Sequence, residues 1–516
     1  MGYETPVLVE QVYPGDRFRI SLAYQMQLAP MLNPVYDGLE VNFEAFFVPN
    51  RIIDTRWKEF WTGYNDYDQM TPTNIAPLRL VSVTTDSNTY QNGSTPRVPT
   101  TPIGIGSLFD FLGYQFADHF PTSGLPAHSA ATASSHIYTL NCNAIPFVAY
   151  NRIFDDWYRN ERVQQARLYN YYNNRVYDTR NIYSAYVLED NGDGEDFYFD
   201  DRGATHMDVS LFRRNYKKDR FTTALPEPII GGDVHIPANT DYNGLLSSAA
   251  GNGIINGTEA NGFNLNALAL GTIEQLKLAF KEYSYRMKDT YNGNRYVESI
   301  ESHYGIRVPD STLQRSLYLG SARDYVNFGE VYQTSSGDGQ GTNGALGDYA
   351  GRGGSAGEHY LFDEEFYEHG FVFVLMCVTP MNRYFQGVKR MFTRFDRNEY
   401  FEPEYQNIGD DFLTVGELYN AQDATVNNVF GYNSRWIELK TRYNELHGDF
   451  ANTGSMMYNW NFARSFDSVP TISEKFSQIA PVNKPFVDTD VVNDNYYVDI
   501  LFHFDALRPV LAVESF

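Results

Sequence analysis

The sequence predicts a mainly β fold, organised as one antiparallel β-sandwich of Greek-key or jelly-roll type. Two observations favour this class. Strand-like stretches with alternating apolar residues lie near both ends of the chain, and the region between them has the patterns of helices and long loops. At 516 residues, the chain is long enough for one core fold with large insertions. A sandwich tolerates such insertions because its loops emerge at the ends of the sheets.

The N-terminal strand patterns cover residues 16–24 and 39–48. In the first, apolar and polar residues alternate, which places Phe18, Ile20 and Leu22 on one face. In the second, one face is apolar and the other is polar only in its first half, so we expect both faces to be at least partly covered. These two faces carry, respectively, Val41, Phe43, Ala45 and Phe47, and Asn42, Glu44, Phe46 and Val48.

The C-terminal strand patterns lie at residues 371–380 and 498–505. The first reads FVFVLMCVTP and is apolar on both faces, as expected for a strand deep inside a sandwich. The second alternates between Val498, Ile500, Phe502 and Phe504 on one face and Asp499, Leu501, His503 and Asp505 on the other. The first and last strands of the expected sandwich are therefore remote from each other in the chain.

Helical spacing of apolar residues appears in three places. Residues 51–63 show it around two tryptophans, and Gly63 is expected to end that helix. A second helix is expected near residues 145–167. A third is expected near residues 272–289, where a capping-box sequence precedes the apolar stripe.

We expect residues 1–516 to form a single domain in which residues 150–365 are a long insertion region. Residues 71–140 read as long loops around one or two short strands. Residues 335–358 are dominated by glycine, and residues 229–270 are rich in glycine and asparagine, so both are expected to be flexible.

The composition points to surface that other chains cover. Aromatic residues make up 16% of the chain, and aromatic side chains are enriched at interfaces. The 40 basic residues include ten lysines, which leaves 30 arginines, and interfaces favour arginine over lysine. The base composition of the coding genome would also explain that ratio. The formal net charge of −24 argues against a dedicated nucleic-acid-binding protein but leaves room for one local basic surface.

Two cysteines are too few for a disulfide framework or a four-thiolate zinc site. The N-terminal residues lack the charged start and apolar run of a signal peptide, and no stretch reaches the ~20 apolar residues of a membrane helix. We therefore expect a soluble protein that folds in a reducing cytoplasm.

Motifs for catalysis or cofactor binding are weak. GQGTNG at 339–344 fits a dinucleotide-binding spacing but no helix pattern follows it, so a flexible loop is favoured. EDNGDGED at 189–196 has the acidic character of a calcium loop, yet Gly192 stands where an EF-hand needs Asp or Asn, so a solvated acidic loop is favoured. Carboxylate pairs are numerous in so acidic a chain, and none identifies a catalytic dyad. We expect no catalytic residue, metal or cofactor.

One dense basic run, RRNYKKDR at 213–220, is the candidate for nucleic-acid contact. Its cations could bind phosphates while the tyrosine stacks on a base. It could equally be a solvated face or pair with an acidic neighbouring chain. The candidate contact residues are Arg213, Arg214, Tyr216, Lys217, Lys218 and Arg220.

Several segments, in the same order along the chain, resemble conserved segments of the major capsid proteins of microviruses, small tailless phages with circular single-stranded DNA. The chain is most similar to the gokushovirus branch. The matches span nearly the whole chain. They are PVYDGLEVNFEAFFVPNRIIDTRWKEFWTG at 34–63, DRFTTALPEPIIGG at 219–232, RYVESIESHYGIRVPDSTLQRSLYLGSA at 295–322, EFYEHGFVFVLMCV at 365–378, FGYNSRW at 430–436 and the C-terminal LRPVLAVESF.

This resemblance implies an eight-stranded viral jelly roll with two four-stranded sheets, and assembly of many identical copies into a T=1 icosahedral shell. It implies that long insertions form most of the outer surface and the contacts between subunits. Residues 229–270 are the candidate for the threefold protrusion of gokushoviruses, although their modest length also fits a short or absent protrusion. Implied partners are a small basic DNA-packaging protein, packaged single-stranded DNA, a minor pilot or spike-type virion protein and a host surface receptor.

The sequence thus predicts a structural protein, a major capsid subunit without enzymatic activity, located in the virion after assembly in the host cytoplasm. The alternative is a carbohydrate-binding or glycan-active β-sandwich protein, since tyrosine, tryptophan and asparagine suit sugar binding; the missing export signal and carboxylate pair argue against it. The aromatic corner near residue 50 would pack on the core and on neighbouring copies. The candidate interface or structural residues are Phe46, Pro49, Arg51, Trp57, Trp61 and Trp436.

Overall fold

The computed structural model describes most of the chain, and the chain divides into two units, Met1–Ala224 with Asp310–Phe516, and Leu225–Pro309. The described residues are 1–54, 56–63, 79–81, 108–114, 142–168, 181–185, 205–208, 211–227, 277–278, 280–282, 284–285, 288, 296–306, 314–332, 349–405, 410–420, 424–480, 482–487 and 495–510. Each unit is described by itself below.

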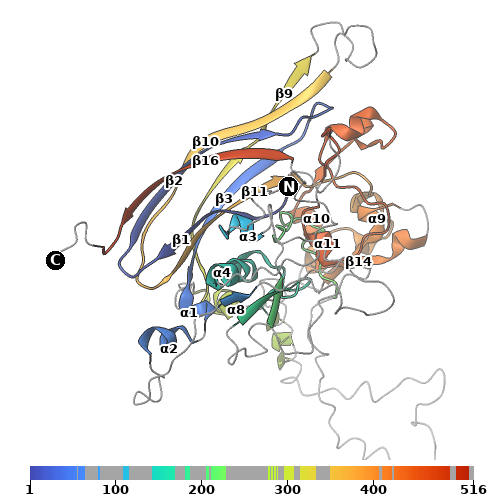
Figure 1. Ribbon diagram of the computed structural model, residues 1–516. Coiled ribbons are helices and arrows are strands. Elements are labelled where there is room, and N and C mark those ends of the chain that lie inside the picture. The colour runs from blue at the N-terminus through green and yellow to red at the C-terminus, as the bar shows by residue number, and fades with distance from the viewer. Residues whose placement is uncertain are drawn as a thin grey trace, which may run out of the picture. The chain divides into compact units, whose positions relative to one another are not determined.

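The first unit contains two four-stranded antiparallel sheets (Figure 1). In spatial order, the first sheet consists of β1 (Thr5–Val12), β11 (Gly370–Pro380), β3 (Leu39–Pro49) and β8 (Leu317–Tyr325). The second consists of β16 (Tyr496–Leu507), β2 (Arg17–Leu28), β10 (Tyr349–Glu365) and β9 (Asn327–Tyr332). Strands from the two ends of the sequence pair directly, as β1 does with β11 and β2 with β16. The mainly β, antiparallel class expected from the sequence is therefore confirmed.

The main core lies between the two sheets. On β2, Phe18, Ile20 and Leu22 are fully buried, whereas Arg17 and Arg19 are exposed, so the predicted alternation is correct. β16 contributes its alternate, partly buried side chains to the same core. From β3 and β11, the core residues are Leu39, Val41, Phe43, Ala45, Phe47, Val372, Val374, Met376 and Val378.

The first sheet is buried on its other face as well. Figure 1 shows α3 (Leu108–Phe111) and α4 (Ile145–Ile153) on the side of this sheet away from β2 and β16. A second core forms there, in which Phe46 and Val48 of β3 and Phe371, Phe373 and Leu375 of β11 pack with α1, α3 and α4. Double coverage explains why every residue of β11 is buried, including the thiol of Cys377, as its apolar sequence predicts.

The corner after β3 contains two short helices in place of the single helix expected at 51–63. These are α1 (Asn50–Ile53) and α2 (Trp57–Thr62). Asp54 interrupts the helix with extended dihedral angles, and its carboxylate accepts a hydrogen bond from the N–H of Arg56 at 3.0 Å. Gly63 ends α2 in the left-handed region at φ 74°, where its N–H donates to the carbonyl of Glu59.

The helix expected near 145–167 is shorter than predicted. α4 continues into one π-helical turn, Phe154–Tyr158, and the helical dihedral angles end at Arg159. The following residues are held instead by the carboxylate of Asp155, which accepts from the backbone N–H groups of Arg167 and Leu168 at 2.9 Å. Four short strands form a further sheet in the order β5 (Cys142–Asn143), β4 (Arg79–Val81), β6 (Asn181–Ala185) and β7 (Thr205–Asp208).

The insertion between β3 and the next sandwich strand ends earlier than expected. The strands β8, β9 and β10 belong to the two main sheets, although all three lie within the 150–365 region assigned to the insertion. The glycines of 349–358 predict flexibility, but these residues form the first half of β10. Gly353 and Gly357 face neighbouring side chains so closely that an added Cβ would lie 2.5 and 2.4 Å from them, which explains why glycine occurs inside this strand.

A second excursion, residues 381–487, separates β11 from β16 and is here called the C-terminal excursion. It consists of short elements around a small third core. In chain order these are β12 (Arg383–Tyr384), η5 (Arg390–Phe392), η6 (Arg397–Glu399), η7 (Pro403–Tyr405), β13 (Asp410–Thr414), α9 (Val415–Leu418), η8 (Ala424–Asn427), β14 (Val429–Ser434), α10 (Ile437–Lys440), β15 (Asn444–Glu445), η9 (Gly448–Ala451), η10 (Met456–Trp460) and α11 (Glu474–Ser477).

The second unit is described mainly in its last third. α8 spans Tyr296–Tyr304, and the described residues between 277 and 288 are helical, which agrees with the helix expected near 272–289. The rings of Tyr285 and His303 stack with centroids 4.1 Å apart. The candidate protrusion, 229–270, lies outside the described residues, as do 189–196 and 339–344. Of the helices that the structure describes in either unit, none has the length and apolar content that a membrane crossing requires.

Candidate assembly surface and the basic segment

The basic segment 213–220 lies inside the first unit, and most of its charges have internal partners. Arg214 is the clearest case. Its guanidinium donates to Glu4 at 3.1 Å and to Glu44 of β3 at 2.6 Å, and it lies over the ring of Tyr158. Sequence spacing could not reveal this pairing, because Glu4 and Glu44 are 210 and 170 residues away.

Burial dominates the electrostatics around Glu4. This carboxyl is 1% exposed, and loss of hydration raises its pKa from 4.5 to about 7, against the opposing effect of Arg214. The same burial raises the pKa values of Tyr158 and Cys377 well above their ordinary ranges. The N-terminus is fixed at this cluster by backbone bonds, including the N–H of Glu4 to the carbonyl of Phe212 at 3.0 Å. Arg214 of the basic segment therefore joins Glu4 near the N-terminus to Glu44 of β3.

The remaining members of the basic segment are placed as follows. Arg213 donates to the hydroxyl of Tyr3, and Tyr216 is buried under the guanidinium of Arg464. Arg220 is 5% exposed and pairs with the buried carboxylate of Glu417 on α9. Lys217 extends toward solvent but pairs with Glu40 of β3, and Lys218 is exposed. Contact of this segment with DNA stays a prediction, and the side chains oriented toward solvent are those of Lys217 and Lys218.

The interface candidates from the aromatic corner are distributed between core and surface. Phe46 is 1% exposed and contacts Trp157 and Tyr158 in the second core, and Pro49 is buried at the end of β3. Arg51 is half-buried and holds Glu368 through two hydrogen bonds, at 3.0 and 3.1 Å. These three residues fix the corner in the single chain.

The tryptophans among the candidates differ from one another. Trp57 of α2 is partly buried against the second core, and its ring contacts those of Trp61 and His369. Trp61 is 59% exposed. Trp436 is 5% exposed and lies beneath the guanidinium groups of Arg394 and Arg435. Only Trp61 of these three offers a large exposed surface to another chain.

A larger exposed apolar set lies in the C-terminal excursion, and sequence reasoning did not select it. It follows β12 and reads MFTRFDRNEYF at 391–401. The alternation of apolar side chains with arginine is a signal that could have drawn attention to it, because this composition is typical of interface cores. Its exposed members are Met391, Phe392, Phe395, Tyr400 and Phe401.

Within the described residues, no group of three His, Cys, Asp or Glu side chains could hold a metal ion. The carboxylates of Glu4 and Glu44 share the guanidinium of Arg214; Glu4 is buried and Glu44 is partly buried. The arrangement is suited to fixing segments of the chain together.

Two antiparallel sheets packed face to face and interrupted by long excursions are consistent with the β-sandwich of viral capsid proteins. Comparison with known families agrees. The chain belongs to the phage family described as Capsid protein (F protein), whose model matches residues 1–116 and 118–515.

Three curated relatives are named Capsid protein VP1, and the similarity covers nearly their full length. The chain is 27% identical to Capsid protein VP1 of Chlamydia phage 1, with 99% of this chain and 92% of the relative covered. It is 26% identical to Capsid protein VP1 of Bdellovibrio phage phiMH2K (98% and 90%) and 23% identical to that of Spiroplasma virus 4 (99% and 91%). The resemblance to microvirus capsid proteins of the gokushovirus-like branch is thereby confirmed. The chain is a structural capsid protein, and its place is in the virion as one of many copies.

Proposed function

We propose that this chain is the major capsid subunit of a tailless phage and forms a T=1 icosahedral shell around a circular single-stranded DNA genome. The observation that carries the proposal is the family match over nearly the whole chain. The two four-stranded sheets support an eight-stranded jelly roll, in which β1, β11, β3 and β8 form one sheet and β16, β2, β10 and β9 the other. The subunit has no enzymatic role in this proposal.

The charge of the chain supports the proposed partners. A shell of subunits at −24 each repels a polyanionic genome, so packaging needs cations from another source. A small basic DNA-packaging protein would supply them. Lys217 and Lys218 are proposed as additional contacts of the subunit with DNA. Assembly is placed in the host cytoplasm, and a minor pilot or spike-type protein and a host receptor are proposed to bind the finished shell.

The test is co-expression of the chain with its companion phage proteins, followed by velocity sedimentation and electron microscopy. We expect isometric shells of megadalton mass, or discrete ring-like intermediates, from the wild-type chain. A protein that stays a small, compact species at high concentration with its companions present would contradict the proposal. Such a species would instead revive the carbohydrate-binding alternative.

A further inference from the structure

Residues 389–401 of the C-terminal excursion, here called the inverted loop, expose apolar side chains to solvent. Phe395 is 88% exposed, the largest value among the exposed large apolar side chains of the described residues. Isolated exposed apolar residues are ordinary, but a contiguous group is not. The group and its fractional exposures are Met391 (56%), Phe392 (64%), Phe395 (88%), Tyr400 (54%) and Phe401 (41%).

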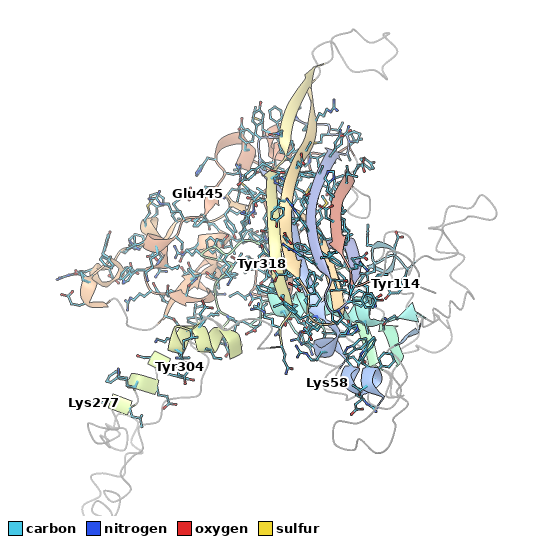
Figure 2. All side chains as sticks on the ribbon, turned by 90° about the vertical axis from the view of Figure 1, so that its left-hand side faces the viewer. Lys58, Tyr114, Lys277, Tyr304, Tyr318 and Glu445 are labelled. Carbon is cyan, nitrogen blue, oxygen red and sulfur yellow. The ribbon has the colours of Figure 1, made fainter. Side chains whose placement is uncertain are left out.

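Three of the four cations of the inverted loop, Lys389, Arg390 and Arg394, pair with carboxylates of the excursion, whereas Arg397 is exposed. Lys389 lies 2.7 Å from Glu445, which Figure 2 labels, and Arg394 pairs with Glu438 of α10. Arg390 lies 3.3 Å from the buried carboxylate of Glu417 on α9. Its guanidinium also lies over the ring of Phe412 on β13. An ordinary surface loop would bury the apolar groups and solvate the cations. Here the polarity is reversed.

Hydrogen bonds fix the local backbone conformation of the inverted loop. A capping box closes η6: the carboxylate of Glu399 accepts from the N–H groups of Phe395 at 2.6 Å and Asp396 at 3.1 Å. At the end of the loop, the ring of Phe401 meets that of Trp436 edge to face with centroids 5.5 Å apart. The loop backbone is thus held at η6, and the ring of Phe401 is held at the end of the loop.

A rigid apolar surface of this kind is suited to binding another protein. Aromatic side chains held in place before association lose little conformational entropy when they are covered, which favours tight contact. Leu439 of α10, which follows Glu438 in the sequence, is also 57% exposed. Exposed residues of both signs border this surface, with Arg397 at 91% side-chain exposure and Asp396 beside it. An apolar centre with a mixed charged rim is the anatomy of a protein interface.

We propose that the inverted loop is a contact between two copies of this chain in the shell. This rests on the proposed function. The charges of the inverted loop indicate which molecule covers it. DNA requires exposed cations and a basic packaging protein requires exposed carboxylates, but three of the four loop cations are paired and both loop carboxylates, Asp396 and Glu399, belong to the capping box. The exposed charges that remain within the loop are one of each sign, Asp396 and Arg397. Two copies that each carry −24 repel each other, so their contacts need apolar area where acidic charge is locally balanced by cations. The inverted loop meets that requirement.

The primary test compares Phe395→Asp with Phe395→Leu in the full chain, co-expressed with its companion proteins. We expect Phe395→Asp to fold with the wild-type thermal midpoint, because the side chain is exposed, and to lower the yield of sedimenting shells by about tenfold or more. Phe395→Leu keeps an apolar side chain and should assemble normally. Wild-type yield of shells from Phe395→Asp would overturn the inference.

A second measurement does not depend on how well the charged variant folds. A photo-crosslinking amino acid placed at position 395 should join two copies of this chain within purified shells, seen as a band of twice the subunit mass. Crosslinking to any other virion or host protein, or only within one chain, would overturn the inference. The two proposals fail separately: a wild-type chain that forms no shells contradicts the capsid function, whereas wild-type shells with normal Phe395→Asp assembly contradict only this contact.

Discussion

The first sheet of the sandwich and the C-terminal excursion bury their side chains in different ways. In the first sheet, β3 and β11 pair over eleven residues and are covered by apolar groups on both faces. In the excursion, no strand or helix exceeds six residues among those described, and ion pairs and ring contacts between short elements replace regular pairing. Its core is small, with Phe221, Ala224, Tyr384, Leu413, Val415, Leu418, Phe430 and Phe476 as its buried members.

The two kinds of burial have different roles: apolar burial stabilises the whole unit, and buried ion pairs specify how short segments are arranged. Apolar burial between long strands is non-directional and contributes in proportion to area, so it supports the whole unit. Buried ion pairs contribute little net stability but are costly to break, so they fix a particular arrangement of short segments. We therefore expect damage to the first sheet to lower global stability and damage to the excursion to act locally. Substitutions in each region and one pH dependence test this contrast.

The largest effect is expected from Phe373→Ala. This side chain on β11 is fully buried between the first sheet and the helices that cover it. Its removal leaves a cavity that the surrounding strands cannot fill, and we expect a loss of about 3 to 5 kcal/mol in the free energy of unfolding. Chemical denaturation of the isolated subunit measures it, with the exposed Tyr497→Ala of β16 as the control. A loss below about 1 kcal/mol would show that the second core is loosely packed.

A smaller and more local effect is expected from Arg220→Met. Its guanidinium pairs with the buried carboxylate of Glu417, and Arg390 stays as a second cation near that carboxylate. Because one partner remains, we expect a cost near the lower end for a broken buried pair, about 3 kcal/mol. Hydrogen exchange should accelerate in the C-terminal excursion while the amides of β3 and β11 stay protected. Lys218→Met is the exposed control, and equal acceleration in both regions would refute the local character.

The sequence predicted the sandwich strands because their side-chain period is a local property. The alternation in β2 and β16 and the double apolar faces of β3 and β11 correspond directly to burial in the structure. Local patterns were less informative where a single side-chain contact determines whether a helix continues. The side chain of Asp54 accepts a backbone hydrogen bond and breaks the helix expected at 51–63, and no periodicity reveals that.

Two further features depend on partners distant in sequence. The glycines of β10 look like a flexible segment, yet they allow neighbouring side chains to approach that strand closely. The basic segment looks like a surface for phosphates, but Arg214 and Arg220 meet carboxylates that are 170 or more residues away in sequence. The sequence did not single out the aromatic residues of the inverted loop, because composition alone does not tell whether a phenylalanine is exposed or buried.

The aromatic corner offers a sharper form of the same comparison, since Trp57 and Trp61 lie one turn apart on α2. Trp57 is partly buried against the second core, and Trp61 is mostly exposed. We expect Trp57→Ala to lower the free energy of unfolding by about 2 kcal/mol, roughly half the cost of a fully buried aromatic residue. Trp61→Ala should change it by about 0.5 kcal/mol or less.

Shell yield separates the roles of the two tryptophans. If Trp61 lies between copies, Trp61→Ala will reduce assembly at unchanged subunit stability, while Trp57→Ala will reduce assembly in proportion to its loss of stability. Sedimentation of co-expressed shells and denaturation of free subunits give the two quantities. Stability and yield that both match the wild type in Trp57→Ala would mean that the corner is not held by this ring.

A further effect is a pH dependence from Glu4, which is linked to β3 through Arg214. Burial raises the pKa of Glu4 from 4.5 to about 7 in the folded protein. Between these values the folded chain keeps a proton that the unfolded chain releases, so the free energy of unfolding declines as the pH rises, by at most about 1.4 kcal/mol per pH unit.

Glu4→Gln removes this titration and leaves Arg214 paired with Glu44. The free energy of unfolding of the variant minus that of the wild type should therefore increase from pH 4.5 to 7 and be constant above that range. High salt should change the curve little, because the group is buried and poorly screened. A difference that is flat or decreasing from pH 4.5 to 7 would mean that Arg214 keeps Glu4 charged and that the N-terminus is held by an ion pair throughout this range.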